Sequence, residues 1–334
     1  MNALLPCADH REFRLLNDYQ QRFPLCPTPF ARVAEELGTE ATAVLSAYRR
    51  WQQEGVISRI GPVFAPNRIG ASTLAALAVP EDQLERVAAL VSAFPEVNHN
   101  YQREHVWNLW FVVTAGNADL LSGVLQRIAT QSACPLIEAP LEAPYHIDLG
   151  FDLGAEARTL APPADRSSGE ASSPPDPTLL EALQDGLPLV ERPYGALAKK
   201  AGLGELELIG RVGEWLASGL ISRFGVVVRH HELGYNANAM CVWDVPAERV
   251  DELGRLLATE SGVNLCYRRR RSLPAWPYNL YCMIHGRARE AVLARRSEIA
   301  ARLGLDAFSH AILFSNRRFK QCGARYVATG NSHA

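Results

Sequence analysis

The 334-residue sequence predicts an α+β protein built from one unit that occurs twice. Each unit is predicted to be a winged helix-turn-helix followed by a ferredoxin-like βαββαβ domain. Three observations support this prediction. Matching blocks recur in the two halves of the chain, a segment rich in proline and serine separates the halves, and the hydrophobic periodicity changes from helical to strand-like within each half.

The internal repeat is carried by short blocks rather than by one long stretch. Residues 55–61 read G-V-I-S-R-I-G, and residues 219–225, which lie 164 positions later, read G-L-I-S-R-F-G. Three more pairs of blocks match: Phe23-Pro24-Leu25 with Leu187-Pro188-Leu189, Val97-Asn98-x-x-Tyr101 with Val263-Asn264-x-x-Tyr267, and Asn108-Leu109 with Asn279-Leu280. The chain is therefore predicted to be a duplication.

A linker is expected between the halves. Residues 161–177 contain five prolines and four serines, and no Val, Ile, Leu, Met or aromatic residue. Such a segment cannot bury enough apolar surface to offset its ordering entropy. The predicted domains are a first helix-turn-helix at 1–66, a first ferredoxin-like domain at 67–153, the linker at 154–177, a second helix-turn-helix at 178–232 and a second ferredoxin-like domain at 233–328.

The start of each half predicts the helix-turn-helix. In the first half, apolar residues recur at helical spacing over residues 12–52. Thr28 followed by Pro29 is typical of a helix start, Gly38 is typical of a helix end, and Thr39 is expected to cap the next helix. An apolar strand begins at 55–61, which completes the pattern of a winged helix-turn-helix.

The remainder of each half predicts the βαββαβ order. Strands are expected at 73–79, 97–102, 107–114 and 136–151, and helices at 81–94 and 119–131. The second and third strands are expected to pair as a hairpin. The second half repeats the pattern over residues 237–326.

Composition excludes several classes of protein. Thirty-four Lys and Arg oppose 36 Asp and Glu, for a formal net charge of −2, which argues against a nucleic-acid binder or a surface for anionic lipid. No apolar run approaches the roughly 18–20 residues of a membrane span, and the start of the sequence lacks a signal-peptide pattern. The seven cysteines form no C-x-x-C pair, so we expect no disulfide framework and no metal site, and a cytoplasmic location.

The helix-turn-helix raises the question of DNA binding. The N-terminal residues of the second helix would enter the groove. They read T-E-A-T at 39–42 and E-L-E-L at 205–208, so acidic groups would face phosphate and no Lys or Arg is available to read guanine. These residues argue against DNA as a partner.

Residues that suit catalysis gather between the two middle strands of the first ferredoxin-like domain. Residues 97–108 read V-N-H-N-Y-Q-R-E-H-V-W-N, and strand alternation would place His99, Tyr101, Arg103 and His105 on one face. A lone histidine is most often structural. Two histidines with a tyrosine and an arginine on one face indicate a functional site.

The matching segment of the second half keeps the cations but loses both imidazoles. Residues 263–271 read V-N-L-C-Y-R-R-R-R, in which Tyr267 and Arg269 align with the tyrosine and arginine of the first half. Leu265 and Arg271 stand where the first half has histidines. This asymmetry predicts one catalytic half and one supporting half.

Other cations add to this pattern. Arg59 and Arg223 occupy matched positions in the two wings, and further basic clusters contain Arg229 and residues 317–320. The run Arg268–Arg271 can be read as an ordinary solvated face or phosphate patch. In a chain of net charge −2, however, this local concentration indicates a polyanionic partner of limited size. The planar fork of arginine suits carboxylates as well as phosphates.

The duplicated blocks together with V-N-H-N-Y-x-R-x-H resemble the siroheme decarboxylases, a branch of the Lrp/AsnC-type regulator scaffold. The resemblance to a D-type subunit covers residues 10–152, and that to an L-type subunit covers residues 178–328. It implies that two usually separate subunits are fused here and pair through their sheets as an internal pseudo-dimer. A further homo-oligomer stays open.

The resemblance also implies a reaction. Siroheme decarboxylases remove carbon dioxide from the C12 and C18 acetates of siroheme, giving 12,18-didecarboxysiroheme on the way to heme d1. The implied partners are siroheme and its product, with no cofactor beyond this iron tetrapyrrole. The implied substrate-binding residues are Arg268, Arg269, Arg270, Arg271, Tyr267, Arg59 and Arg223, with Trp107 as an apolar wall.

The roles of the catalytic candidates stay open at this point. Arg103 would help to orient the acetates, and either His99 or His105 would donate the proton. Either histidine could instead ligate the substrate iron. Tyr101 is a hydrogen-bonding partner or an alternative acid. Two alternative functions are a transcription regulator and a tetrapyrrole-sensing module.

Overall fold

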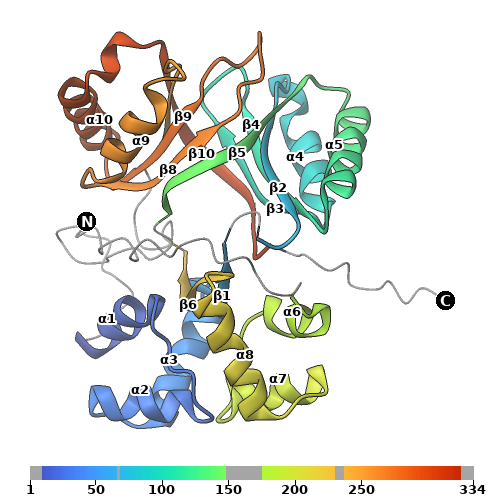
Figure 1. Ribbon diagram of the computed structural model, residues 1–334, viewed down its shortest axis with the longest axis vertical. Coiled ribbons are helices and arrows are strands. Elements are labelled where there is room, and N and C mark those ends of the chain that lie inside the picture. The colour runs from blue at the N-terminus through green and yellow to red at the C-terminus, as the bar shows by residue number, and fades with distance from the viewer. Residues whose placement is uncertain (1–9, 66–67, 148–174, 230–236, 325–334) are drawn as a thin grey trace.

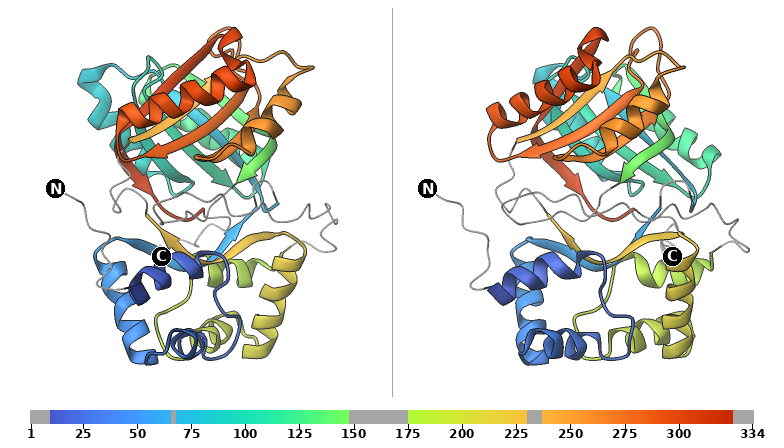
Figure 2. Two further views of the ribbon diagram at one scale, coloured as in Figure 1. Left: turned by 90° about the vertical axis from the view of Figure 1, so that its left-hand side faces the viewer. Right: turned by 60° about the vertical axis from the view of Figure 1, so that its left-hand side comes forward.

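The computed structural model describes residues 10–65, 68–147, 175–229 and 237–324, which form two layers (Figure 1). One layer holds the helix-turn-helix units of both halves, and the other holds a β-barrel with helices on two flanks. Figure 2 shows the same division from two other directions. Among the described residues, every helix is too short or too polar to span a membrane.

The helix-turn-helix units agree with the prediction in both halves. Pro29 is the first residue of its helix, and Gly38 ends that helix in the left-handed conformation with φ of 62°. The predicted cap at Thr39 is wrong by one position, because Glu40 is the residue that precedes the next helix. The elements are α1 (His10–Asn17), α2 (Pro29–Leu37), α3 (Ala41–Gln53) and β1 (Ile57–Phe64), then α6 (Pro177–Gln184), α7 (Pro193–Ala201), α8 (Glu205–Ala217) and β6 (Ile221–Val228).

The wing is shared between the halves. Each half supplies one strand, and β1 pairs antiparallel with β6, with Gly61 opposite Gly225. The glycine that ends each repeated block is required because backbone of the other half approaches it, and a Cβ on Gly61 would lie 2.9 Å from the Cα of Gly186. A Cβ on Gly225 would lie well under 3.0 Å from the carbonyl oxygens of Tyr19 and Gln20, so only glycine allows the chain to pass there.

The ferredoxin-like domains also agree with the prediction. In each, the strands follow the order last, first, third, second across the sheet, as βαββαβ requires. The first domain comprises β2 (Ala71–Leu77), α4 (Leu84–Ala93), β3 (Val97–Arg103), β4 (Leu109–Ala115), α5 (Ala118–Ser132) and β5 (Leu136–Ile147). The second comprises β7 (Ala237–Trp243), α9 (Val250–Ala258), β8 (Val263–Arg269), β9 (Leu280–Gly286), α10 (Arg289–Leu303) and β10 (His310–Gln321).

Two seams join the sheets into a closed barrel. We call these strand pairs the β5–β8 seam and the β10–β3 seam. In each, the last strand of one ferredoxin-like domain pairs with the second strand of the other. The halves therefore form the predicted internal pair. Large apolar side chains from both halves fill the barrel interior, among them Trp110, Met240, Trp276 and Tyr281.

The repeated Asn-Leu pair is explained by one local structure that occurs twice. The Asn108 side chain accepts from the N–H of Val79 at 3.0 Å and donates to its carbonyl at 2.8 Å. Asn279 makes the same two bonds with Val245, both at 2.9 Å. Each side-chain amide thus satisfies the backbone N–H and carbonyl of a residue just beyond the first strand of its domain, in place of a strand partner.

Residues 154–174 of the predicted linker at 154–177 lie outside the described residues. Its last position, Pro177, is the first residue of α6, where Asp176 caps the helix by accepting from the N–H groups of Thr178 and Leu179. The second half therefore begins with a capped helix at the end of the proline-rich segment.

Candidate active site

A row of three polar side chains lies along β3. His99 and Tyr101 stack with ring centroids 6.2 Å apart and an interplanar angle of 14°. The guanidinium of Arg103 lies 5.8 Å from the Tyr101 ring. Tyr101 is opposite Trp110 in the strand register, and Trp110 is part of the barrel interior, so the row faces inward rather than toward the flanking helices.

His105 does not belong to this row, so the prediction that all four side chains share one face is wrong. The strand ends at Arg103, and His105 lies in the connection to β4. Its Nδ1 accepts the N–H of Trp107 at 3.1 Å, and its ring meets the ring of Trp276 edge-on at 5.3 Å. An extended strand rises about 3.3 Å per residue, so the row from His99 to Arg103 spans about 13 Å along β3. His105 follows at the Arg103 end of this row.

The second half of the chain supplies a cation beside this row. Arg318 on β10 is opposite Tyr101 in the register of the β10–β3 seam, and Gln321 is opposite His99. The Nη1 of Arg318 donates to Gln321 Oε1 at 3.2 Å. A strand of the second half therefore lies beside the histidine of the first half.

The helix-turn-helix layer supplies two more arginines. The side chain of Arg59, from β1, reaches the segment that follows β10. A Cβ built on Gly323, two residues after the end of that strand, would lie 2.9 Å from Arg59 Nη1. Arg229 follows β6, and its Nη1 would lie 3.3 Å from a Cβ on Gly55. The shared wing thus carries one arginine from each half toward the barrel.

Burial and these cations set the charge of the two rings. Burial, and secondly the charge of Arg59, lower the pKa of His99 to about 4, so this imidazole is neutral near pH 7. Burial raises the pKa of Tyr101 against the opposing effect of nearby arginines, so its hydroxyl stays protonated. The charged groups that act on the two rings are Arg59, Arg103, Arg229 and Arg318.

We call these four arginines with His99 and Tyr101 the His99 site. The four arginines are cations, so together they favour an anionic ligand, and their planar guanidinium groups suit carboxylates. Burial lowers the pKa of His105.

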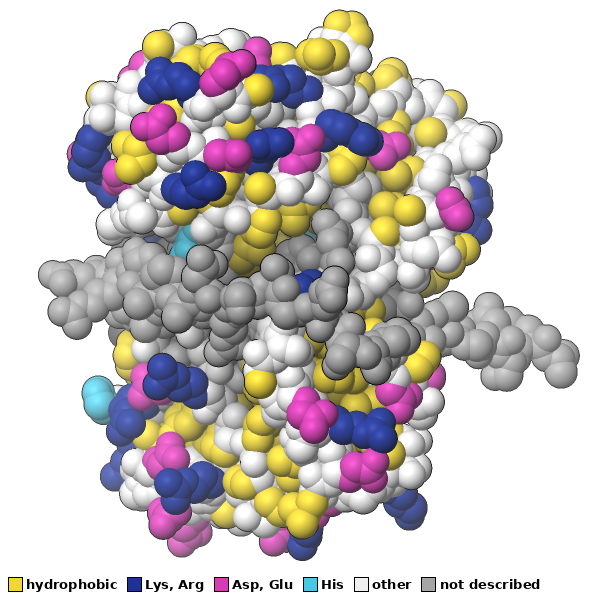
Figure 3. Space-filling view, viewed as in Figure 1, with side chains coloured by type: hydrophobic (Ala, Val, Ile, Leu, Met, Phe, Trp, Pro, Cys, Tyr) yellow, Lys and Arg dark blue, Asp and Glu magenta, His cyan; other side chains and the backbone are white. Residues whose placement is uncertain are grey.

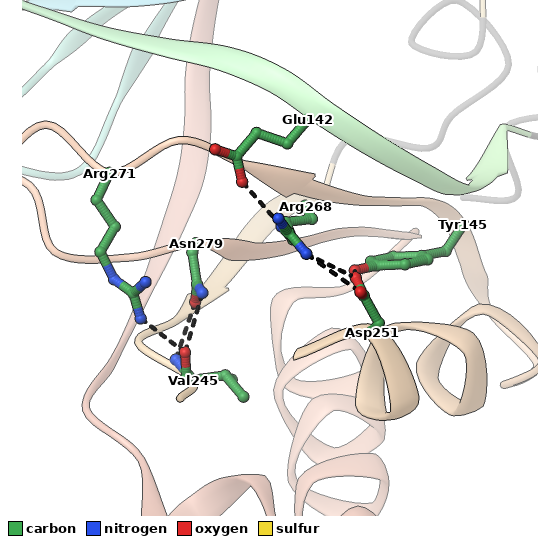
Figure 4. A network of polar contacts seen from close by, with 7 residues as sticks. All are labelled: Glu142, Tyr145, Val245, Asp251, Arg268, Arg271 and Asn279. Atoms are coloured by element: carbon green, nitrogen blue, oxygen red, sulfur yellow. Dashed lines mark hydrogen bonds and ion pairs between the residues drawn. The ribbon is translucent and has the colours of Figure 1, made fainter. Parts of the chain in front are cut away.

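The arginine run of the second half does not converge on one place. Arg268 forms ion pairs with Glu142 and Asp251 on the outside of the barrel, as Figure 4 shows. Arg269 points inward over the Tyr267 ring at 5.1 Å and donates to the carbonyl of Ala139 at 2.9 Å.

The other two arginines of the run also point apart. Arg270 is exposed, and Arg271 binds Asp244 and the carbonyls of Val245 and Pro277. These contacts neutralise two of the four charges and spread all four around the end of β8. The geometry therefore gives little support to a single carboxylate clamp made of this run.

Arg269 and Arg103 occupy equivalent positions. Arg103 donates to the carbonyl of Leu313 on β10 at 3.1 Å, as Arg269 does to Ala139 on β5. Both bonds cross from one half to the other, so each arginine also ties a seam. A structural function thus accompanies the predicted substrate contact at both positions.

Two further candidates have mainly structural surroundings. The guanidinium of Arg223 is buried and donates to the carbonyls of Gln20 and Val226, and the matched Arg59 makes the equivalent of the second bond, to the carbonyl of Pro62. The carbonyl of Trp107 accepts from the indole N–H of Trp110 at 2.6 Å, and the Trp107 ring packs against the barrel interior, which fits the predicted apolar wall.

Comparison with known proteins identifies the family. A model of the siroheme decarboxylase NirDL-like HTH domain matches residues 12–57 and 176–221, and a model of the AsnC-like ligand binding domain matches residues 68–140 and 232–320. The siroheme decarboxylase NirDL subunit of Paracoccus denitrificans is 42% identical over 95% of this chain and 97% of its own. This chain belongs to the siroheme decarboxylase NirDL family.

The solved NirDL structures share the fold. A crystal structure of the siroheme decarboxylase NirDL has a TM-score of 0.69, with 28% sequence identity over 95% of this chain and 94% of that chain. A second, in co-complex with an iron-uroporphyrin III analogue, has a TM-score of 0.65 at the same identity, over 95% of this chain and 93% of that chain. The fused halves are thus a feature of this family.

The sequence predicts Arg59 as a substrate-binding candidate without placing it near His99, and it does not place Arg318 or Arg229 among the candidate site residues. Both lie in basic clusters that the sequence reveals. Their position depends on β10 crossing to the first half and on β6 pairing with β1. No local pattern in the sequence encodes either pairing.

Proposed function

We propose that this enzyme is a carboxy-lyase that decarboxylates siroheme at its C12 and C18 acetates, giving 12,18-didecarboxysiroheme for heme d1. Membership of the NirDL family supports the substrate. Within this chain the proposal is carried by the His99 site, where four arginines act on the stacked rings of His99 and Tyr101 and the imidazole is neutral near pH 7.

The reaction needs three things from the protein. Each acetate must be held as an anion, the C–C bond electrons must pass into the macrocycle as carbon dioxide leaves, and a proton must reach the resulting methylene carbon to make a methyl group. Arg59 and Arg318 suit the first task, because they approach His99 from two different strands. The stacked rings of the row suit a flat macrocycle.

His99 is the better placed proton donor. A bound carboxylate offsets the cations beside it and raises its pKa, so the substrate itself brings the proton to the imidazole. Tyr101 stacks on His99 and keeps its hydroxyl proton, which suits a hydrogen bond to the substrate. His105 is held at the other end of the row by Trp107 and Trp276, which suits a positioning role.

The iron belongs to the substrate, and the proposal needs no resident cofactor. A neutral imidazole is also a suitable iron ligand, so the spectrum of bound siroheme is part of the test. We further propose that the protein works in the cytoplasm, since its scattered cysteines suit a reducing compartment.

The test is anaerobic incubation with siroheme, followed by mass spectrometry and absorption spectroscopy. We expect stepwise loss of two molecules of carbon dioxide. His99→Gln should bind siroheme but leave its mass unchanged, whereas His105→Gln, which alters a positioning residue, should still remove carbon dioxide, at a reduced rate. Tight binding by the wild-type protein without any change in mass would instead support a sensing module and overturn the enzyme proposal.

A DNA-binding function receives little support from the surface. Glu205 and Glu207 occupy the first turn of α8, and Glu40 precedes α3. On the face in Figure 3, basic and acidic side chains are interspersed over both layers. A mobility-shift assay with duplex DNA at low salt is the direct check.

A further inference from the structure

The two seams of the barrel are built differently, although they are equivalent by the duplication. In each, the last strand has an irregular register at one aromatic residue, Tyr145 between Pro144 and His146, and Phe319 between Arg318 and Lys320. Tyr145 packs against the core beneath α9, and Phe319 packs against the core beneath α4. Each half therefore presents one aromatic side chain to the first helix of the other half's βαββαβ domain.

The receiving helices differ at the point of contact. A Cβ built on Gly254 of α9 would lie well under 3.0 Å from the ring carbons Cε2 and Cδ2 of Tyr145, so the ring fills the space that a methyl group would need. The equivalent position in α4 is Ala88. The equivalence is shown by their carbonyls, which accept from Asn100 and Cys266 at matched positions in β3 and β8.

A polar network accompanies the ring at the β5–β8 seam (Figure 4). The Tyr145 hydroxyl donates to Asp251 Oδ1 at 2.5 Å, and Arg268 Nη1 donates to both oxygens of Asp251 at 3.0 and 3.1 Å. Arg268 Nε donates to Glu142 Oε2 at 2.8 Å. Strand β5 of the first half thus meets α9 and β8 of the second half in one network around the half-buried Tyr145 hydroxyl.

The β10–β3 seam has none of these partners at the matching positions. Phe319 has no hydroxyl, Gln102 stands in place of Arg268, and Asn316 stands in place of Glu142. Glu85, in place of Asp251, forms an ion pair with Arg317 instead. The two seams therefore cannot exchange their aromatic residues without loss of contacts.

We infer that Tyr145, Gly254, Asp251 and Arg268 form a pairing lock. These contacts make the second half pair with the last strand of a D-type half and not with the last strand of another L-type half. In a pair of two D-type halves, Tyr145 would meet the methyl group of Ala88. In a pair of two L-type halves, a phenylalanine would enter the space at Gly254, and Asp251 would lose its hydroxyl donor.

The lock has a consequence for the active site. Correct pairing brings Arg318 opposite Tyr101, whereas pairing of two D-type halves would place Pro144 there. The lock therefore excludes an assembly that would lack one of the site's arginines. The inference itself rests on the seam contacts and does not depend on the substrate.

The experiment uses the full chain with pairs of engineered cysteines and a short bismaleimide cross-linker. Ile147→Cys with Leu265→Cys, which lie opposite each other across the β5–β8 seam and leave the lock residues unchanged, reports the correct pairing and should cross-link within one chain. Glu142→Cys with Gln102→Cys reports pairing of two D-type halves, and should give no dimer band above the background of the unmodified protein. Adding Gly254→Ala to the second pair should produce a dimer band on a denaturing gel.

Thermal unfolding gives an independent readout. Gly254→Ala should lower Tm by at least about 3 °C, because the added methyl overpacks the seam. Gly123→Ala in α5, where nothing lies within 4 Å of the added Cβ, is the matched control and should not lower Tm. If Gly254→Ala does not fold, Tyr145→Phe keeps the ring, removes the hydroxyl, and should still yield the dimer band.

Two results would overturn the lock. One is a dimer band from Glu142→Cys with Gln102→Cys that is as strong as the internal product of the correct pair. The other is a Gly254→Ala protein with unchanged Tm and unchanged cross-links.

Discussion

Binding of a polyanionic tetrapyrrole should drive proton uptake by His99. In the free protein its pKa is about 4, so at pH 6 about 1% of the imidazole is protonated. A carboxylate bound about 5 Å away contributes about 3 kcal/mol at an effective dielectric constant of about 20, which corresponds to about 2.4 pKa units. The pKa in the complex then lies between about 6 and 7, and about 0.7 of a proton is taken up at pH 6.

Isothermal titration calorimetry measures this uptake directly. Iron-uroporphyrin III is a suitable probe, because it carries acetates and binds without requiring turnover to be followed. The apparent binding enthalpy is compared at pH 6 in buffers with different ionisation enthalpies, and the slope gives the number of protons taken up. The matched protein is His99→Gln, which keeps a polar side chain but cannot titrate.

The reasoning is refuted if wild type and His99→Gln take up the same number of protons, or if the wild type takes up none. Either result would mean that no carboxylate lies close to the imidazole in the complex. The arginines cannot imitate the effect, because they stay protonated at this pH.

Three other predictions can be checked on the same protein. Arg318→Gln should weaken siroheme affinity by about tenfold or more in an absorption titration, since one charge-assisted contact is lost, whereas Arg270→Gln at an exposed position should change it by less than about twofold. Since the folded-state pKa of His99 lies below its unfolded value, the unfolded chain binds more protons between pH 4 and about 6.5, and stability should rise by about 2 kcal/mol between pH 5 and pH 7. Urea unfolding at pH 5 and pH 7 measures this rise, which His99→Gln should abolish. Asn279→Ala should cost about 1–2 kcal/mol in the same assay, because the buried N–H of Val245 would lose its acceptor, whereas the Val245 carbonyl would keep its bond from Arg271.

The sequence predicted the architecture well because its signals are local. Helix ends are marked by Pro29 and Gly38, and the order of strands and helices follows the hydrophobic period. The repeat then doubles that information. The glycine that ends each wing block was visible as a repeated letter, and the structure gives its reason in the close approach of the chain at Gly225.

The candidate site was predicted only in part. His99, Tyr101 and Arg103 lie in one row because strand alternation is a local rule. His105 departs from the row because β3 ends two residues before it, and strand ends depend on the partner strand rather than on the sequence nearby. The run Arg268–Arg271 reads as one patch along the sequence, yet its members alternate between the barrel interior, carboxylates outside the barrel and solvent.

By itself the sequence determined the duplication, the two kinds of domain, the family and the common face of His99, Tyr101 and Arg103, since each of these is written in residue order and spacing. Only the tertiary structure decided which cations surround His99. Arg59 on β1, Arg318 on β10 and Arg229 just after β6 reach the site through β1–β6 and β10–β3 pairing. These pairings join residues far apart in the sequence, and no short stretch of sequence contains that information.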